Sequence, residues 1–310
     1  MAVGSCGSIS IDMIKGFHIE LTNICTLKCP GCARTQFIEQ FPRNWTNHSI
    51  DIDVLLNFLD IDLDGIGITF CGVYGDPIYH PAFLKIVKQF KQRGAAIRIV
   101  TNGSYKTKKW WESLVNLLDS NDRIRFSVDG LPENFTTYRV NADWKTIEVG
   151  MNVAAQSQCY TTWAYIPFSY NENDIDTARE LCNSIGINEF VITHSERFDQ
   201  STEHLIPTNI ESQQYAIQQN WKLTQTVDSI NPKCSTQEEH YISADGFYVP
   251  CCYLADYRFY YKTQFGKNKK QYNISGTTFS KLIADKHTAN FYQTLNQQPG
   301  CQFNCGSNFG

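Results

Sequence analysis

The sequence lacks the features that would assign the chain to a membrane or to the secretory pathway. No apolar run approaches the roughly 20 residues that a transmembrane helix needs. The first residues, MAVGSCGSISIDMIKG, contain no charged segment followed by an apolar one, so we predict a flexible leader over residues 1–15 and no export signal. The net charge of −4 gives no overall attraction to nucleic acid or anionic lipid. We therefore expect no membrane partner and a cytoplasmic location.

Cysteine, in contrast, is abundant and unevenly distributed. The 310 residues include 12 cysteines, of which three lie in the stretch CTLKCPGC and five lie beyond residue 230. With 42% hydrophobic residues, a chain of this length has enough apolar side chains for a core and needs no disulfide framework. Clustered cysteines without an export signal therefore indicate metal ligands in a reducing compartment.

Short apolar segments alternate with amphipathic ones in the first two thirds of the chain. The predicted strands are 17–22, 65–72, 96–102, 123–129, 161–168 and 189–194. Helical spacing of apolar residues predicts helices between them. Such alternation is typical of a parallel α/β sheet, either open or curled into an incomplete barrel, because six strands are too few for the eight-unit barrel.

The pattern changes after about residue 195. We predict a core over residues 16–198, a polar linker with one helix over 199–230, and a small cysteine-rich domain over 231–310. No internal repeat is evident.

The stretch CTLKCPGC follows directly after the first predicted strand, at the end of the sheet where ligands bind. Structural zinc usually takes four protein ligands, so three thiolates leave one coordination position open. A cubane iron–sulfur cluster with a small molecule on its fourth iron suits this arrangement. A structural zinc site and a chance grouping in a turn are the alternatives.

The spacing C-x3-C-x2-C after a first strand resembles the signature of the radical SAM enzymes, and the similarity extends over roughly residues 15–195. The segment TFCGVYGDPIYHPAF resembles the part of that family in which Gly-Gly-Glu-Pro usually follows the second strand. IVTNGS at 99–104 and FSVDGL at 126–131 resemble its third and fourth strand segments. YRVN at 138–141 and SYNENDIDTARELCNSIGI at 169–187 follow in the family's order.

The resemblance implies a partial (β/α)6 TIM-like barrel with a [4Fe–4S] cluster on Cys25, Cys29 and Cys32. S-adenosylmethionine (SAM) would bind the open iron through its amino and carboxylate groups. An electron from the reduced cluster would cleave SAM to methionine and a 5′-deoxyadenosyl radical, which abstracts hydrogen from the substrate. An electron donor such as flavodoxin or ferredoxin is implied as a partner. The protein positions SAM and excludes water.

The family motifs also imply which residues contact SAM. Main-chain groups at Gly75 and the side chain of Asp76 are expected at the methionine ammonium, and Ser127 and Asn102 at the ribose or carboxylate. Arg139 is expected to bind the SAM carboxylate, because a guanidinium can do so in bidentate fashion. A surface salt bridge is the alternative role for this arginine.

Two positions depart from the family pattern. Asp76 replaces the commoner glutamate and is one methylene shorter, and Gly31 stands where many members place an aromatic residue before the third cysteine.

The cysteine-rich tail resembles the C-terminal extension called SPASM, or its shorter form, twitch. The stretch GFYVPC carries the spacing G-x4-C, and four thiolates are enough for one fully ligated auxiliary [4Fe–4S] cluster. The expected ligands are Cys234, Cys251, Cys301 and Cys305. Cys252 is left over, and the G-x4-C match favours Cys251. A four-cysteine zinc site is the alternative.

Two further features have both a functional and an ordinary interpretation. The segment 257–272 has five basic residues, no acidic one and interleaved aromatics, which fits either a nucleic-acid surface or a solvated hairpin edge. Cys71 and Cys159 are candidates to donate hydrogen to a substrate radical, with Cys71 favoured because it ends the second strand. Both are also compatible with small core residues.

Three classes of function follow. The favoured one is a radical SAM enzyme that modifies a peptide or protein side chain. The second is a radical SAM enzyme acting on a nucleoside, a nucleic-acid base or another small molecule. The third is a non-catalytic protein that binds zinc or an iron–sulfur cluster.

Overall fold

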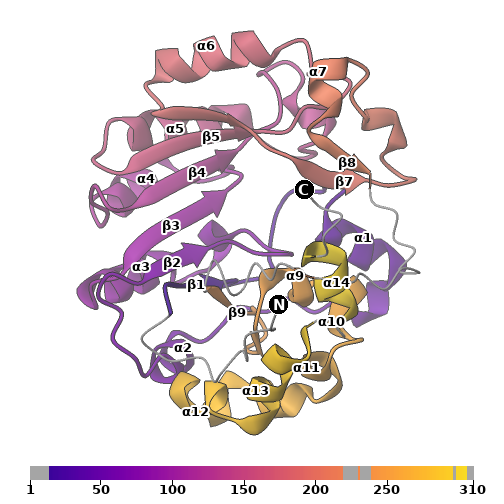
Figure 1. Cartoon of the computed structure of the whole chain (residues 1–310). Coiled ribbons are helices and arrows are strands. Elements are labelled where there is room, and N and C mark those ends of the chain that lie inside the picture. Colours follow the sequence, from indigo (N-terminus) through magenta and orange to yellow (C-terminus); the bar gives the residue numbers. More distant parts are fainter. Residues whose placement is uncertain (1–13, 219–229, 231–238, 296–297, 306–310) are drawn as a thin grey trace, which may run out of the picture.

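A curved and mostly parallel sheet forms the centre of the molecule (Figure 1). The structure is a computed structural model that describes residues 14–218, 230, 239–295 and 298–305. The strands of the sheet lie in the order β10-β9-β1-β2-β3-β4-β5-β6, and the sheet is not closed. Their bounds are β1 Gly16–Ile19, β2 Gly67–Phe70, β3 Ala96–Thr101, β4 Arg123–Ser127, β5 Tyr160–Tyr165, β6 Glu189–Ile192, β9 Glu239–Ile242 and β10 Tyr248–Val249. This confirms the predicted partial TIM-like α/β fold.

Helices cover the sheet and connect its parallel strands. The α-helices in the first part of the chain are α1 Ala33–Gln40, α2 Ile52–Phe58, α3 Phe83–Gln92, α4 Lys108–Val115, α5 Trp144–Ala155, α6 Ile175–Ile185 and α7 Ile210–Gln213. Those in the tail are α9 Cys252–Ala255, α10 Tyr257–Tyr260, α11 Gln264–Lys267, α12 Phe279–Ile283, α13 Lys286–Gln293 and α14 Pro299–Cys305. Short 3-10 turns are η2 Pro42–Asn44, η3 Pro77–Tyr79, η4 Phe135–Thr137, η5 Glu203–Leu205, η6 Lys269–Tyr272 and η7 Ile274–Gly276. No described helix has the length and apolar character that a membrane crossing requires.

Helix α3 illustrates why these segments fold as they do. Phe83, Ile86, Val87 and Phe90 recur at helical spacing, and all four are buried against the sheet. The chain then turns at Gly94, whose φ of 78° lies in the left-handed region that glycine adopts without strain.

The tail joins the central sheet at its β1 edge. Strand β9 pairs with β1 in parallel, and β10 pairs with β9 in antiparallel orientation. Phe279 of α12 packs edge-on against Phe17 of β1, with ring centroids 4.8 Å apart. The predicted domain boundaries therefore divide one continuous sheet, and they stay predictions.

The basic and aromatic segment 257–272 is helical. It forms α10, α11 and η6, with Phe259, Phe265 and Tyr272 buried. The expectation of a hairpin edge is therefore wrong, because the segment folds into three short helices that each bury one aromatic ring.

A second, smaller sheet lies beyond β6. It consists of two parallel strands, β7 Ser195–Phe198 and β8 Ala216–Gln218. A small apolar cluster connects this region to the cysteine loop, because it contains both Phe198 and Cys29.

Candidate functional site

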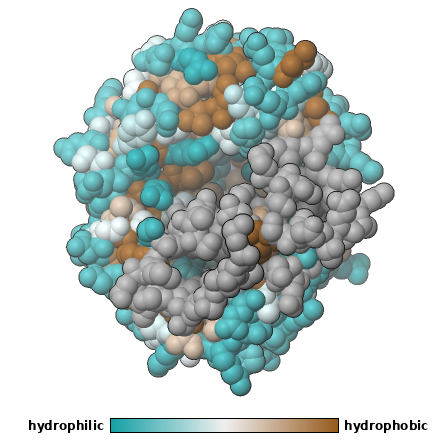
Figure 2. Space-filling model, in the orientation of Figure 1, coloured by the Kyte–Doolittle hydropathy of each residue, from teal (hydrophilic) through white to brown (hydrophobic). Residues whose placement is uncertain are grey.

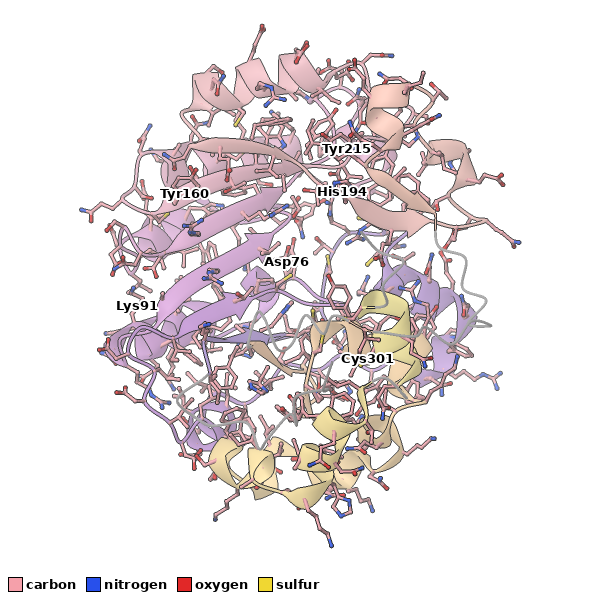
Figure 3. The ribbon with its side chains drawn as sticks, viewed as in Figure 1. Asp76, Lys91, Tyr160, His194, Tyr215 and Cys301 are labelled. Atoms are coloured by element: carbon pink, nitrogen blue, oxygen red, sulfur yellow. The ribbon has the colours of Figure 1, made fainter. Side chains whose placement is uncertain are left out.

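A cavity lies at the carboxyl ends of the first four strands, and every predicted SAM-site residue lines it. Figure 3 shows Asp76 in the middle of the molecule, where β2 and β3 end, while Lys91 lies at the opposite end of the strands. The predicted residues in the lining are Cys25, Cys29, Cys32, Cys71, Gly75, Asp76, Asn102, Ser127 and Arg139. Others are Leu27, Arg34, Gly72, Val73, Tyr74, Val100, Thr101 and Arg197. The parallel strands therefore bring together residues that are more than 100 positions apart in sequence.

The cysteine loop connects β1 to α1. The Cys32 amide donates to the Cys29 carbonyl at 3.1 Å, and the Cys32 carbonyl accepts from Gln36 at 3.0 Å, so the third cysteine begins the helix. Burial raises the pKa of Cys25 to about 12 and that of Cys29 to about 11. These values favour neutral thiols unless a cation or a metal stabilises the thiolates.

Among the described residues, no three His, Cys, Asp or Glu side chains are placed to hold a single metal ion. A four-iron cluster is a larger group, in which each thiolate binds a different iron.

Glu20 holds the loop that follows β2. Its Oε1 accepts from the amides of Tyr74 at 2.7 Å and Gly75 at 2.9 Å. Its Oε2 accepts from the Tyr241 hydroxyl at 2.8 Å. The Glu20 carboxyl therefore ties the end of β1 to the loop after β2 and to β9.

Gly75 is the residue that lets this loop pass close to the cysteine loop. A Cβ at position 75 would overlap the carbonyl of Thr22, which is main chain and cannot move aside cheaply. A side chain here would displace the loop that carries Asp76.

Asp76 fixes the end of β3. Its carboxylate accepts from the Thr101 hydroxyl at 2.9 Å and from the Asn102 amide at 2.7 Å. The Asn102 side chain also bonds Asp76 at 2.5 Å and lies 3.7 Å from the Cys25 sulfur. Burial raises the pKa of Asp76 to about 6, and these hydrogen bonds oppose that rise. The direct roles of Asp76 and Asn102 toward SAM stay predictions.

Arg139 belongs to a buried ion pair. Its Nε donates to the Asp129 carboxylate at 2.6 Å, and Asp129 is fully buried. The other Asp129 oxygen accepts from the Ile166 amide at 2.8 Å. The alternative of a surface salt bridge is therefore wrong, because this pair orients the arginine at the cavity wall.

The two cysteines proposed as hydrogen donors have different places. Cys71 lines the cavity, where burial raises the pKa of its thiol to about 12, so it is held as a neutral thiol. Cys159 packs in the hydrophobic core and does not line the cavity.

No sequence motif indicated Glu20, Arg34, Tyr138 or Arg197 as residues of the site. The sequence does contain an indication for Glu20, because an acidic residue inside the mostly apolar segment FHIELT is unusual and suggests a specific role. The sequence contains no such indication for Arg197, because its approach to the cysteine loop depends on the tertiary position of β7.

The tail cysteines lie on neighbouring elements. Cys251 and Cys252 are at the start of α9, and Cys301 and Cys305 are one turn apart on α14. Helices α9 and α14 lie side by side (Figure 1). Figure 3 shows Cys301 below Asp76. Cys234 lies outside the described residues.

Two adjoining open cavities share Phe37, Asn44 and Tyr261, and the inner one is also lined by Tyr74, a residue of the SAM-site cavity. The inner one has a volume of about 170 Å³, and the outer one has about 570 Å³. We call them together the aromatic cavity, because their walls include Phe37, Phe41, Trp45, Tyr74, Tyr257, Tyr260 and Tyr261. Figure 2 shows a different hydrophobic (brown) region on the face it draws, in the middle of the upper half, with hydrophilic (teal) side chains around the outline.

The rings of the aromatic cavity form a connected series. The centroid of Phe37 is 5.2 Å from that of Tyr257 and 6.4 Å from that of Tyr74. Phe41 and Tyr261 are exposed at its outer end, by 45% and 59%. Exposed aromatic residues beside a cavity often mark a surface for a ligand or partner.

Comparisons with known proteins match both the sequence and the fold. The family model described as the radical SAM superfamily matches residues 19–182, more than half of the chain. The tungsten-containing aldehyde ferredoxin oxidoreductase cofactor-modifying protein of Pyrococcus furiosus is 31% identical over 123 residues. That match covers 38% of this chain and 32% of the relative, so the chain spans about a third of that curated relative's length.

Solved structures show the same fold. SuiB of Streptococcus suis bound to S-adenosylmethionine has a TM-score of 0.61 at 13% identity, covering 91% of this chain and 68% of that chain. SuiB bound to the precursor peptide SuiA has a TM-score of 0.60 at 14% identity, covering 91% and 67%.

The burial of Glu20 predicts a pH dependence of stability. Burial raises the pKa of this carboxyl from 4.5 to about 7, so the folded state keeps a proton that the unfolded chain releases between these values. The free energy of unfolding should therefore fall as pH rises from 4.5 to about 7, by about 3 kcal/mol from this group. Glu20→Gln should remove that contribution in urea denaturation, whereas Glu112→Gln, on the exposed side of α4, should follow the wild type. Parallel pH profiles for the wild type and Glu20→Gln would refute the assignment.

Proposed function

The chain belongs to the radical SAM superfamily, and we propose that this radical SAM enzyme acts on a side chain of a peptide or protein. The observation that carries the proposal is the aromatic cavity, which opens to solvent and shares Tyr74 with the SAM-site cavity. An inner volume of about 170 Å³ suits one side chain, and the larger outer part suits the neighbouring residues of an extended segment.

The residues present fit the cofactors that the family uses, a [4Fe–4S] cluster and SAM. Three thiols of one loop line the cavity, and Gly75, whose packing against Thr22 leaves no room for a Cβ, exposes main chain to the same cavity. Cys25, Cys29 and Cys32 would hold the cluster. When bound and reduced, the cluster supplies the electron that cleaves SAM into methionine and a 5′-deoxyadenosyl radical.

The chain's own groups would bind and orient SAM. The backbone at Gly75 and the Asp76 carboxylate would bind the ammonium, and Arg139, fixed by Asp129, would bind the carboxylate; all three line the cavity. Asn102 and Ser127 line the part of the cavity proposed for the ribose. We propose Cys71 as the hydrogen donor to a substrate radical, because it lines the cavity and its neutral thiol retains the S–H that such a step requires.

We further propose that the tail binds an auxiliary [4Fe–4S] cluster through Cys234, Cys251, Cys301 and Cys305, in a SPASM- or twitch-like domain. Support comes from the close packing of α9 on α14. A Cβ on Gly300 of α14 would lie only 2.5 Å from the Cδ2 atom of Leu254 on α9. We also propose an external electron donor such as flavodoxin or ferredoxin. A cytoplasmic location fits the proposal, because reduced thiolates and clusters persist in a reducing compartment.

A substrate test separates a peptide from a nucleoside. A synthetic library of short aromatic-containing peptides is expected to accelerate SAM-dependent 5′-deoxyadenosine formation, whereas a mixture of nucleosides is not. Replacing both Phe41 and Tyr261 with alanine should raise the half-maximal peptide concentration about tenfold, because each ring contributes about 0.5–1.5 kcal/mol.

Tyr160→Ala is the matched control, since Tyr160 is also exposed but lies at the start of β5, away from the site (Figure 3). It should keep the wild-type response to peptide. Acceleration by nucleosides alone would replace the peptide proposal with the small-molecule alternative.

The iron content tests the auxiliary cluster. We expect about eight irons in the reconstituted wild type and about four in a variant with Cys25, Cys29 and Cys32 all replaced by alanine, from four irons per cluster. That variant should be brown and should not cleave SAM, because a cluster with four protein ligands has no open iron. A colourless variant carrying one zinc would make the tail a structural metal site.

A further inference from the structure

Three arginines line the SAM-site cavity, but their charges are balanced differently. Arg139 is paired with Asp129 at 2.6 Å. Within the described part of the chain, Arg34 and Arg197 make no ion pair with a carboxylate, and the Arg34 Nε is buried without a hydrogen-bond partner. Both side chains are half-buried, and withdrawing a cation from water without a counter-charge nearby is unfavourable. The cavity therefore favours an occupant that carries negative charge.

Arg197 is anchored by one hydrogen bond to its main chain and one from its guanidinium. The Thr202 hydroxyl donates to its main-chain carbonyl at 2.9 Å, and its Nη1 donates to the Tyr138 hydroxyl at 3.3 Å. Tyr138 is fully buried and stacks on Phe168, with ring centroids 4.3 Å apart. The positive charge therefore sits on a rigid support at the cavity wall.

Gly31 shows how closely β7 approaches the cysteine loop. A Cβ on Gly31 would lie 2.7 Å from the carbonyl oxygen of Arg197, 2.9 Å from its Cβ and 3.1 Å from the Tyr138 hydroxyl. The position where many members of the family carry an aromatic ring must be a glycine here, because β7 occupies that space. Strand β7 lies beyond residues 19–182, so the matched region does not include Arg197.

We propose that Arg197 is a positioning residue that supplies a fixed positive charge to the cluster on Cys25, Cys29 and Cys32 and thereby raises its reduction potential. Reduction adds one negative charge to the cluster. A cation held nearby at low dielectric stabilises the reduced state more than the oxidised state. This inference rests on the proposed cluster site.

The test is a redox titration monitored by electron paramagnetic resonance, on the signal that changes when SAM is added. Arg197→Gln should lower the potential, with an expected tenfold change in the reduction equilibrium, or about 59 mV for one electron. Arg197→Lys keeps the charge and should stay closer to the wild type. Lys108→Gln removes a positive charge from the exposed face of α4 and should leave the potential unchanged.

An intact cluster with the wild-type potential in Arg197→Gln would overturn the inference while leaving the proposed cluster site standing. If Arg197→Gln forms no cluster on the three loop cysteines, so that the SAM-sensitive signal is missing, Arg197→Lys decides. Retention of the cluster in the lysine variant supports a charge requirement, and loss from both makes Arg197 a packing residue and overturns it. A wild type without a cluster on the three cysteines would refute the proposed function as well.

Discussion

The buried carboxyl of Glu20 connects the three parts of the chain that build the site. One of its oxygens accepts two main-chain amides from the loop after β2, and the other accepts the hydroxyl of Tyr241 on β9. Few other groups in a protein core can receive three hydrogen bonds at once. Because Glu20 follows β1 directly, it also fixes the start of the segment that leads to the cysteine loop.

The cavity that results combines neutral thiols with fixed cations. Burial favours protonated cysteines in the absence of a metal, whereas Arg34 and Arg197 favour negative charge at the same place. Binding a cluster with thiolate ligands would satisfy both tendencies, because it replaces the thiol protons with metal and brings net negative charge to the arginines. Tyr74 lines both this cavity and the aromatic cavity, which puts the proposed substrate site beside the proposed cluster site.

The sequence was informative where the physical cause is local. The strands of the core, the buried face of α3 and the cysteine loop follow from periodicity and from residue order along one segment. The pairing of β9 with β1 joins segments more than 200 residues apart, and no local pattern specifies it. The same holds for two contacts at the site, the ion pair of Arg139 with Asp129 and the approach of Arg197 to Gly31. Both depend on tertiary packing and have no local sequence pattern.

The most direct test of the account is the formation of 5′-deoxyadenosine from SAM by the reconstituted, dithionite-reduced protein. We predict that the wild type forms it and that Cys29→Ala does not, because two remaining thiolates are too few to hold the cluster in the loop. Cys182→Ala is the matched control, since Cys182 is a buried cysteine of α6 that lies in the hydrophobic core, and it should retain activity. Undiminished 5′-deoxyadenosine formation by Cys29→Ala would contradict the assignment of the three-thiol loop as the catalytic cluster site.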